Sequence, residues 1–580
     1  MGNEEIYGGF FVAQIFQKHN IKHVFFLTGG HIAPILIGCK RLGIEAIDVR
    51  HEVTTVFAAD AYSRLSDKVG VAIVTAGPGI TNIVTAVKNA QMAQSPVVII
   101  GGAPPMIYKG KDALQDIDQI AIMKSLVKWH VVIKSYKQIT KVSEAFYRAK
   151  EGVPGPVFIE MSLDLLWPAS MTIGGYTAGA NRMPKTLFGR MQKTFLNLFL
   201  NRMMKGYTEF KAPEPIPLER KASKVADLQK TTFLLENSER PVLLIGSQAI
   251  EYGTVNDLVQ AVEKLKLPVY LSGMARGLLG KDNPLQFRHK RRNALKEADL
   301  VILAGVPNDF RMDYGRSISR KAYLISINLS KDGLKKNRKP DLGFLTSPGN
   351  FLIDLAKRVD KWNDSRTKWF ETLRAREKGR NDEIFKQSKD DLQRINPLKM
   401  SLALDELIDD NSILIGDGGD IIATISYIVQ PRKPLSWLDP GPFGTLGVGA
   451  GFALASKILF PEKEVFLIYG DGSVGYSLIE WDTFARHNIP IIGIIGNDSA
   501  WMQVARGQIS YFNDSVGTEL GDRHYEKAVT AFGPAGFLVE KEEDLKPTLE
   551  KAILLSKQGQ SVLVNVMIGR SDFRKGSVSM

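Results

Sequence analysis

Short apolar runs that end in glycine recur along this chain of 580 residues. In the N-terminal part such runs span 24–27, 71–75 and 97–100, a fourth apolar run follows at 157–160, and stretches of helical pattern lie between them. Runs of four or five apolar residues are long enough for strands that are buried on both faces. Strands that alternate with helices favour a parallel sheet, whose loops gather at its carboxyl edge. This part of the chain is therefore predicted to be an α/β domain.

The same pattern returns in two later parts of the chain. The runs are 242–245, 269–271, 301–304 and 324–328 in the middle part, and 412–415, 465–469 and 491–495 in the last part. We therefore predict three doubly wound, parallel-sheet α/β domains. The predicted segments are a first domain 1–168, an insertion and linker 169–225, a central domain 226–360, a charged helical linker 361–395 and a third domain 396–580.

The composition is typical of a globular protein, with 44% hydrophobic and 24% charged residues. No apolar stretch reaches the roughly 18 residues of a membrane-spanning helix. Residues 1–5 lack the charged and apolar regions of a secretory signal. Cys39 is the only cysteine, so an intrachain disulfide is impossible and a reducing compartment is expected. We therefore predict an intracellular protein.

The net charge of +13 is unevenly distributed. Segment 182–224 contains ten Lys or Arg and three Asp or Glu, so it carries +7 of the excess. No nucleic-acid-binding motif accompanies the charge, and nucleic acid is not expected as a partner. Six apolar residues in this segment follow helical spacing: Leu187, Met191, Phe195, Leu198, Phe199 and Met203. They predict a basic amphipathic helix, which fits either a membrane surface or partner, or packing on its own domain.

A pair of acidic residues follows two of the apolar runs in the third domain. Gly470-Asp471-Gly472 comes after 465–469, and Gly496-Asn497-Asp498 comes after 491–495. In a βαβ unit both carboxylates would lie at the carboxyl ends of neighbouring strands, where open sheets bind ligands. Gly472 allows backbone N–H groups to approach a diphosphate, and Mg²⁺ prefers oxygen ligands. Taken alone, Gly-Asp-Gly is equally typical of an ordinary turn after a strand.

Six sequence motifs, in a fixed order along the chain, indicate a similarity that extends beyond the third domain. They are 28–31, 50–64, 75–82, 115–119, 443–449 and 471–498. With these pieces the chain resembles the thiamine diphosphate (ThDP)-dependent decarboxylase and acetolactate synthase superfamily over nearly all of its length. The resemblance implies that family's three-domain fold, ThDP and Mg²⁺ as cofactors, and active sites between the first domain of one subunit and the third domain of its partner. A homodimer is then the smallest active unit, and homotetramers are common.

The resemblance also implies roles for single residues. Glu52 matches the catalytic glutamate that hydrogen-bonds the aminopyrimidine ring of the cofactor, and Leu446 matches the apolar residue between the two cofactor rings, although simple core packing would look the same. Asp471, Asp498 and the Ala500 carbonyl match metal ligands; Asp498 stands where the family has Asn, and Asn497 is the alternative ligand. The other implied cofactor contacts are Gly30, Gly77, Asn82, Gly418, Gly419, Gly472 and Ser473. The implied substrate contacts are His31, Gln115, Gln503 and Gly507.

Within the superfamily the chain is most similar to the acetolactate synthase-like 2-hydroxyacyl-CoA lyases, through 273–280, 437–441, 475–480 and 568–574. This similarity implies cleavage of the C1–C2 bond of a 2-hydroxyacyl-CoA, which gives formyl-CoA and an aldehyde shortened by one carbon. The alternatives are acetolactate synthase activity on 2-keto acids and a degenerate regulatory subunit.

Two departures from acetolactate synthases favour an acyl-CoA substrate. Gly507 replaces a Trp that shapes a small pocket. Residues 305–311 stand where acetolactate synthases have a different characteristic sequence. FAD is therefore not expected to be required. The animal proteins of the similar group are linked to the endoplasmic reticulum, so a cytoplasmic or peripheral location on that membrane is expected.

Overall fold

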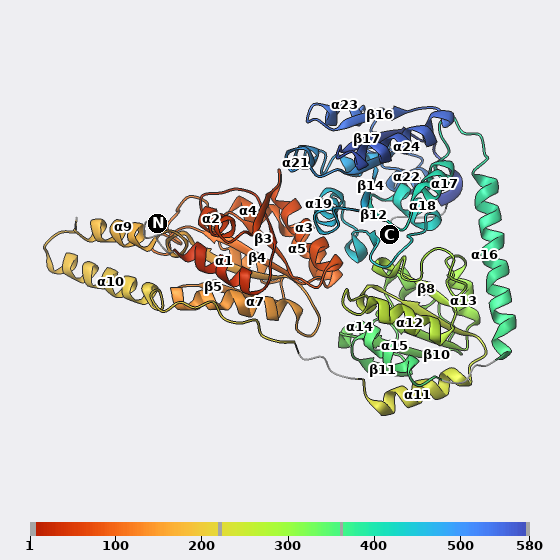
Figure 1. Ribbon diagram of the computed structural model, residues 1–580, viewed down its shortest axis with the longest axis horizontal. Coiled ribbons are helices and arrows are strands. Elements are labelled where there is room, and N and C mark those ends of the chain that lie inside the picture. The colour runs from red at the N-terminus through yellow and green to blue at the C-terminus, as the bar shows by residue number, and fades with distance from the viewer. Residues whose placement is uncertain (1–6, 182, 219–222, 360–363, 576–580) are drawn as a thin grey trace. The chain divides into compact units, whose positions relative to one another are not determined.

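The computed structural model describes residues 7–181, 183–218, 223–359 and 364–575 (Figure 1). The prediction about a secretory signal rests on residues 1–5, which lie outside the described residues, as do Arg182 and residues 219–222 of the basic segment. The chain divides into two compact units, Met1–Glu219 with Gly441–Thr445, and Arg220–Pro440 with Leu446–Met580.

The first unit is built on a six-stranded parallel sheet in the order β2-β1-β3-β4-β6-β5. Its strands are β1 His23–Phe26, β2 Glu45–Asp48, β3 Gly70–Val74, β4 Val97–Ala103, β5 Trp129–Ile133 and β6 Val157–Ser162. Its first helices are α1 Gly8–Lys18, α2 Ala33–Arg41, α3 Glu52–Leu65, α4 Pro78–Asn82, α5 Val84–Ala93, α6 Gln119–Met123, α7 Lys141–Lys150 and α8 Leu163–Leu166. The strands β3, β4 and β6 are buried along their whole length. They therefore form the centre of the core, as expected for apolar runs covered on both faces.

Two further helices, α9 Ala169–Asn181 and α10 Leu187–Met204, complete the first unit. They contact each other through the rings of Tyr176 and Phe199, whose centroids lie 5.8 Å apart. The predicted helix is present, but the six apolar residues do not share one face. Met203 is buried and Phe199 is half-buried, whereas the four earlier ones are exposed. The reason is geometric, because 16 residues at 3.6 per turn rotate the side chain of Met203 by about 160° from that of Leu187.

The second unit contains a five-stranded and a six-stranded parallel sheet, in the orders β11-β10-β9-β7-β8 and β13-β12-β14-β15-β17-β16. The strands of the five-stranded sheet are β7 Pro241–Ile245, β8 Val269–Leu271, β9 Leu300–Ala304, β10 Tyr323–Asn328 and β11 Leu342–Leu345. Its helices are α11 Val225–Glu236, α12 Val255–Leu265, α13 Arg291–Glu297, α14 Lys331–Lys335 and α15 Pro348–Ala356. The long helix α16 Thr367–Gln387 follows, in the segment predicted as a charged helical linker.

The six-stranded sheet carries the acidic residues singled out above. Its strands are β12 Ser412–Asp417, β13 Trp437–Leu438, β14 Glu464–Gly470, β15 Ile492–Asn497, β16 Ala535–Val539 and β17 Val562–Met567. Its helices are α17 Pro397–Leu407, α18 Asp420–Ile428, α19 Gly449–Leu459, α20 Asp471–Val474, α21 Glu480–Arg486, α22 Met502–Phe512, α23 Tyr525–Thr530 and α24 Glu542–Lys557. Side chains of α17, α18 and α24 form one core with β14 and β15. The register pairs Gly470 with Gly496, so the residues after both strands reach the same edge.

The structure confirms three parallel-sheet α/β domains. The unpredicted strands include the edges β5, β11, β13 and β16 and the interior strand β17. Among the residues that the structure describes, no helix combines the length and apolar character that crossing a bilayer requires.

Candidate functional site

Glu52 begins α3 directly after the turn that follows β2, and only 9% of its surface is exposed. The side chain of His51 caps the helix, because its Nδ1 accepts the Val53 N–H at 3.2 Å. Asn82, the last residue of α4, donates from Nδ2 to Glu52 Oε2 at 2.9 Å. The structure thus brings together two of the predicted site residues, and the amide of Asn82 orients the Glu52 carboxylate.

The turn after β3 is fixed by backbone geometry and by a glutamine. Gly77 has φ of +61°, and a Cβ there would lie 2.8 Å from the Gln115 carbonyl oxygen, so both conformation and space favour glycine. Gln119 accepts the Gly77 N–H at 3.3 Å and donates to Glu160 Oε2 at 3.0 Å. Gln119 was not predicted as a site residue, although it ends the quoted piece 115–119. It holds the turn that carries Gly77 against the buried Glu160.

His31 lies after β1 in the same unit, beside a predicted glycine. Its Nδ1 is 3.1 Å from Thr75 Oγ1, and burial lowers the pKa of the imidazole, so the ring is neutral near pH 7. A Cβ on neighbouring Gly30 would meet no atom within 4 Å, so this glycine borders open space. A neutral imidazole next to open space is suited to accept a proton.

The loops after β12 and β14 meet closely in the second unit. A Cβ on Gly418 would lie 3.0 Å from the backbone nitrogen of Gly470, and its φ of +155° is one that side chains rarely adopt. The hydroxyl of Ser473 donates to the Asp417 carbonyl and is 3.0 Å from the Gly470 carbonyl. The side chain of Ser473 therefore ties the two glycine-containing loops together at the first turn of α20. This is a backbone cradle suited to an anion.

Asp417 fixes the segment that contains Leu446. Its buried carboxylate accepts the Gly447 N–H at 3.1 Å and the Gly449 N–H at 2.8 Å. Burial raises the pKa of Asp417 to about 7, and the two N–H groups oppose that shift. Leu446 is half-buried at the start of this segment. Its position is thus set by backbone hydrogen bonds rather than by core packing alone.

Asp471 and Asp498 lie at the carboxyl ends of β14 and β15, as predicted. Burial raises the pKa of Asp471 to about 6. Burial raises the pKa of Asp498 to about 7, with further increases from the charges of Asp471 and Asp420. Asp471 Oδ1 accepts the Gly472 N–H at 3.0 Å, but its buried Oδ2 has no hydrogen-bond partner among the described residues. An unpaired buried carboxylate oxygen in an acidic site is the position where a cation would bind.

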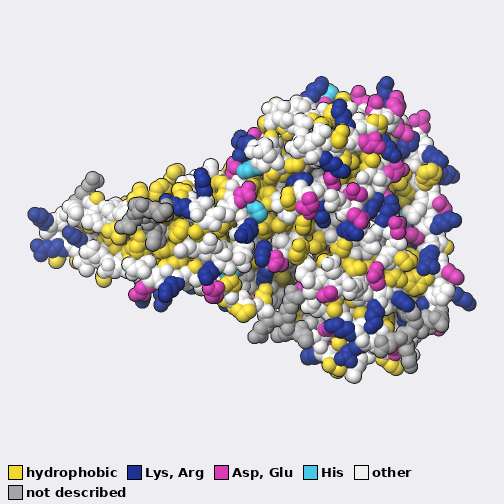
Figure 2. Space-filling view, in the orientation of Figure 1, with side chains coloured by type: hydrophobic (Ala, Val, Ile, Leu, Met, Phe, Trp, Pro, Cys, Tyr) yellow, Lys and Arg dark blue, Asp and Glu magenta, His cyan; other side chains and the backbone are white. Residues whose placement is uncertain are grey.

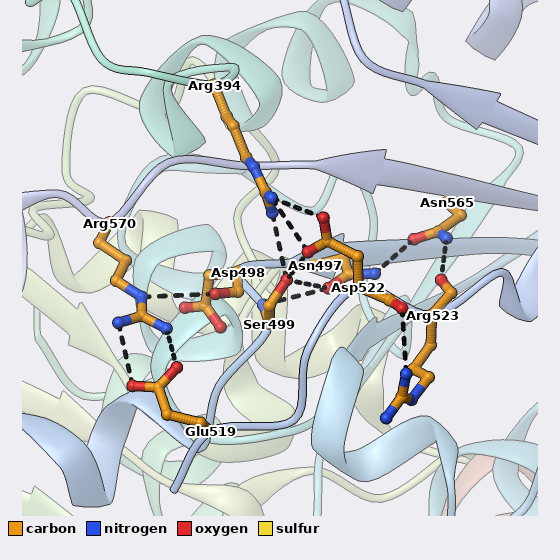
Figure 3. Close-up of polar contacts among 9 residues, drawn as sticks. All are labelled: Arg394, Asn497, Asp498, Ser499, Glu519, Asp522, Arg523, Asn565 and Arg570. Carbon is orange, nitrogen blue, oxygen red and sulfur yellow. Dashed lines mark hydrogen bonds and ion pairs between the residues drawn. The ribbon is translucent and has the colours of Figure 1, made fainter. Parts of the chain in front are cut away.

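The Asn497 side chain is already used within the protein (Figure 3). Its Nδ2 donates to Asn565 Oδ1 at 3.1 Å, and its Oδ1 accepts the Ser499 N–H at 3.1 Å. Ser499 has φ of +59°, which turns the chain sharply after Asp498. The backbone hydrogen bonds next to Ala500 use the Trp501 N–H and the Ser499 carbonyl. They do not use the Ala500 carbonyl oxygen. Asp498 is therefore the better candidate ligand of the two neighbours.

Two arginines balance the charge of this loop. Arg570 forms a two-point ion pair with Glu519 at 3.2 and 2.6 Å, and its Nε is 3.4 Å from the Asp498 carbonyl. The positive charge of Arg570 lowers the pKa values of both Asp471 and Asp498 and so opposes the effect of burial. Arg394 pairs with Asp522 at 2.8 Å and holds the Ser499 hydroxyl at 3.1 Å. No role was predicted for either arginine, although Arg570 lies in the motif 568–574.

Helix α22 begins shortly after the acidic loop and carries two more predicted residues. Gly419 lies close to α22. A Cβ added at Gly419 would be 3.3 Å from the Cβ of Gln503. A Cβ on Gly507 would meet nothing within 4 Å. Arg506 forms a two-point pair with Asp420 at 2.6 and 2.9 Å, which links α22 to the first residue of α18.

Family models match three parts of the chain in the expected order. Residues 6–122 match the N-terminal TPP binding domain of thiamine pyrophosphate enzymes, residues 228–355 the central domain and residues 417–566 the C-terminal TPP binding domain. The chain is also 43% identical over 586 residues to a Caenorhabditis elegans protein named 2-hydroxyacyl-CoA lyase 2, with 99% of this chain and 91% of the relative covered. The chain belongs to the thiamine pyrophosphate enzyme family.

Two other relatives of this thiamine pyrophosphate enzyme differ in their degree of identity and in their names. Human 2-hydroxyacyl-CoA lyase 2 is 41% identical over 586 residues, which cover 99% of this chain and 92% of the relative. An acetolactate synthase large subunit of Mycobacterium tuberculosis is 31% identical over 567 residues, which cover 97% of this chain and 96% of the relative. The chain is thus an enzyme that uses thiamine diphosphate, the cofactor also called thiamine pyrophosphate. Its relatives include both lyases and synthases.

The residues of both binding domains fit this cofactor. To hold it, the N-terminal domain would supply Glu52 and the Gly77 turn, and the C-terminal domain would supply the cradle of Gly418 and the first turn of α20. The described residues contain no group of three or more His, Cys, Asp and Glu side chains that could hold a metal ion. A divalent cation bound by Asp471 and Asp498 would therefore need further oxygens from the backbone and from the diphosphate, which is how Mg²⁺ usually binds at phosphates.

Proposed function

We propose that this enzyme is a ThDP- and Mg²⁺-dependent lyase that cleaves 2-hydroxyacyl-CoA into formyl-CoA and an aldehyde one carbon shorter. The observation that carries the choice of substrate is a cationic cavity of about 560 Å³ in the second unit. The printed names of the Caenorhabditis elegans and human relatives support the same substrate class.

The cavity contains far more positive than negative side chains. The basic residues that line it are Arg276, Arg288, Lys290, Arg291, Arg292 and Arg311, and among its described lining residues Asp313 alone is acidic. Burial lowers the pKa values of Arg276, Arg288 and Arg291; the charges of Asp439 and Glu377 oppose this shift for Arg276 and Arg288, whereas the charge of Arg276 adds to it for Arg291. Desolvation, the largest of these effects, disfavours all three charges, so a polyanion in the cavity would relieve a real electrostatic cost. The phosphates of coenzyme A meet that need.

The cavity is connected to the cofactor loops by one helix. Ser426 and Tyr427, which line it, lie near the end of α18, whose first residue Asp420 directly follows Gly418 and Gly419. Arg276 donates to the Ser426 carbonyl at 2.5 Å, and the Nε of Arg276 is buried without a partner in the described structure. At 1.5 Å per residue, Ser426 is about 9 Å along the helix from Asp420. A nucleotide held in the cavity is thus near enough for its long arm to extend toward the diphosphate loops.

Space and apolar surface for an acyl chain are found along α22. Gly507 borders open space, and the side chains of Val504, Ile509 and Phe512 on the same helix are exposed. A tryptophan at 507 would occupy the open volume that a long chain needs. These features favour a fatty acyl group over the methyl group of pyruvate.

The reaction requires one bond to break and one proton to move. The C1–C2 bond of the substrate breaks, the proton of the 2-hydroxyl group leaves as the aldehyde forms, and C1 gains a proton to become the formyl carbon of formyl-CoA. The chemistry that bound ThDP supplies is a carbon nucleophile and an electron sink. Glu52, oriented by Asn82, would hydrogen-bond the aminopyrimidine ring. We assign the acceptance of the hydroxyl proton to His31, because the neutral tautomer that carries its proton on Nδ1, beside Thr75 Oγ1, accepts through Nε2.

The decisive experiment compares substrates and one cavity variant. Purified protein with ThDP and Mg²⁺ should release a fatty aldehyde from 2-hydroxyacyl-CoA, and Arg291→Gln should raise KM for the thioester about 10- to 100-fold with little change in kcat. Arg374→Gln, an exposed arginine of α16 that does not line the cavity, is the matched control. Acetolactate formation from pyruvate without aldehyde release from the thioester would favour the acetolactate synthase alternative instead. Absence of any Mg²⁺-dependent ThDP binding would favour the regulatory subunit.

The remaining predictions concern assembly and location. We propose a homodimer or homotetramer, which sedimentation of the ThDP-bound protein tests directly. That FAD is not required stays a prediction, and the visible absorption spectrum of the purified protein tests it. Cytoplasmic or peripheral placement on the endoplasmic reticulum also stays a prediction, which cell fractionation tests.

A further inference from the structure

Helix α10 carries a stripe of exposed apolar side chains that its own domain leaves uncovered. Leu187, Phe188, Met191, Phe195 and Leu198 are each 64–78% exposed. The opposite side of the helix is the side that packs, through the buried Leu196, Leu200 and Met203. A helix in a globular protein normally buries its apolar face and shows a polar one. An apolar stripe that remains after the helix has packed indicates an interaction surface.

Helix α9, which lies beside α10, also carries exposed apolar side chains and has no charged residue. It packs beside α10, and its Met171 and Ile173 are exposed as well. Residues 169–181 contain no Asp, Glu, Lys or Arg. We call α9 and α10 together the helical hairpin (Figure 1).

The charge around the stripe has a single sign. Residues 183–208 contain five basic residues, Lys185, Arg190, Lys193, Arg202 and Lys205, and no acidic one. At the free end of the hairpin, Figure 2 shows Lys and Arg side chains beside hydrophobic ones. Long basic side chains next to apolar ones can extend to a charged layer while their carbon chains lie along the apolar surface.

An apolar stripe surrounded by basic residues favours one kind of binding partner. A second copy of the chain would meet the same face with the same five positive charges and no acidic side chain in that stretch to pair with them, so symmetric pairing is disfavoured. An anionic lipid bilayer offers hydrocarbon to the stripe and negative headgroups to the basic residues. The 18-residue helix is about 27 Å long with the stripe along its side, so it would lie in the plane of the interface.

We propose that the helical hairpin docks this enzyme on an anionic membrane surface through Leu187, Phe188, Met191, Phe195 and Leu198. The inference rests on the hairpin alone and does not depend on the reaction catalysed. It places the apolar stripe at the boundary of headgroups and acyl chains and the basic residues among the headgroups.

The test is flotation of the full-length protein with vesicles. Wild-type protein should float with phosphatidylcholine–phosphatidylserine vesicles and much less with pure phosphatidylcholine. The double variant Phe195→Asp, Leu198→Asp should lose flotation, because two charges enter the apolar stripe. The matched control is Phe385→Asp, Leu554→Asp, which changes two equally exposed side chains on α16 and α24 and should float like wild type. Replacing Lys185 and Arg190 by Gln should weaken binding about fivefold per charge.

Three results would overturn the proposal. If wild-type protein does not bind anionic vesicles, the hairpin is not a membrane-docking surface. Equal flotation of the stripe and control variants assigns the binding to another part of the chain. A change in sedimentation mass for the stripe variant, without a change in flotation, means that a second copy covers the stripe. ThDP binding by each variant checks that the fold is intact, since neither pair of residues belongs to the cofactor site.

Discussion

The Glu52–Asn82 pair makes a prediction whose size follows from one hydrogen bond. The replacement Asn82→Ala removes the amide that donates to Glu52 Oε2 at 2.9 Å. Glu52 is almost fully buried, whereas Asn82 is exposed, so the change should affect the orientation of the carboxylate more than the stability of the fold.

The expected kinetic loss comes from the strength of a hydrogen bond to a charged group. Such a bond contributes about 1.5–3 kcal/mol, and each 1.36 kcal/mol corresponds to a tenfold change in rate. We therefore expect kcat/KM for Asn82→Ala to fall about 10- to 150-fold. Asn82→Asp should lose more at pH 8 than at pH 6, because two adjacent carboxylates cannot both ionise cheaply.

Asn89 provides a matched control inside the same unit. Its Nδ2 donates to Asp60 Oδ2 at 3.0 Å, so it repeats the amide–carboxylate geometry in a fully buried position away from Glu52. Asn89→Ala should lower the melting temperature, since it removes a partner of a buried carboxylate, while turnover per ThDP-bound molecule stays near wild type. Wild-type kcat/KM in Asn82→Ala, or an equal loss of turnover in Asn89→Ala, would refute the orienting role of Asn82.

Three further predictions address the loops and the histidine. Gly472→Ala should destabilise the protein by about 1–3 kcal/mol, since its Cβ would overlap the Trp501 ring, whereas Gly475→Ala, with its nearest neighbouring atom at 3.5 Å, should be tolerated in a thermal melt. Asp498→Ala should weaken Mg²⁺ binding about tenfold or more in a titration at fixed ThDP, because an oxygen ligand is lost; unchanged affinity would exclude Asp498 as a ligand. Burial lowers the pKa of His31, so the unfolded chain binds a proton at this imidazole before the folded protein does as pH falls. His31 therefore lowers the stability of the fold only below about pH 6.5. The acidic limb of the kcat/KM profile should lie below the same pH. A limb above pH 7 that survives His31→Gln would contradict the assignment.

Much of the fold could be predicted because buried parallel strands show clearly in a sequence. The runs 465–469 and 491–495 correspond to β14 and β15, and the residues after them meet at one edge of the sheet as expected. The unpredicted strands β5, β11 and β16 lie at sheet edges and are only half-buried, so they lack a continuous apolar run. Strand β17 lies inside the sheet, but Asn565 interrupts its apolar run. That same residue forms the bond that holds Asn497.

The candidate site could be predicted only in part, for a related reason. Glycines and carboxylates at strand ends have a local pattern, so Gly418, Asp471 and Asp498 could be found. Their supporting partners come from distant parts of the chain. Gln119 reaches Glu160 across 41 residues and Arg570 reaches Asp498 across 72, and no local spacing reveals such pairs. The apolar face of α10 shows the same limit, since helical spacing alone does not tell which side packs.

The position of Arg570 after the last strand has a consequence for how the protein matures during synthesis. Asp498 leaves the ribosome 72 residues before Arg570, which at 5–20 residues per second is about 4–14 s earlier. During this interval β15 also lacks β17, the neighbour that later separates it from β16. The acidic loop therefore exists first without one of its two balancing arginines and without one side of its sheet. We expect the cation and diphosphate half of the site to become competent only after β17 and Arg570 have been synthesised, so cofactor loading would follow that step.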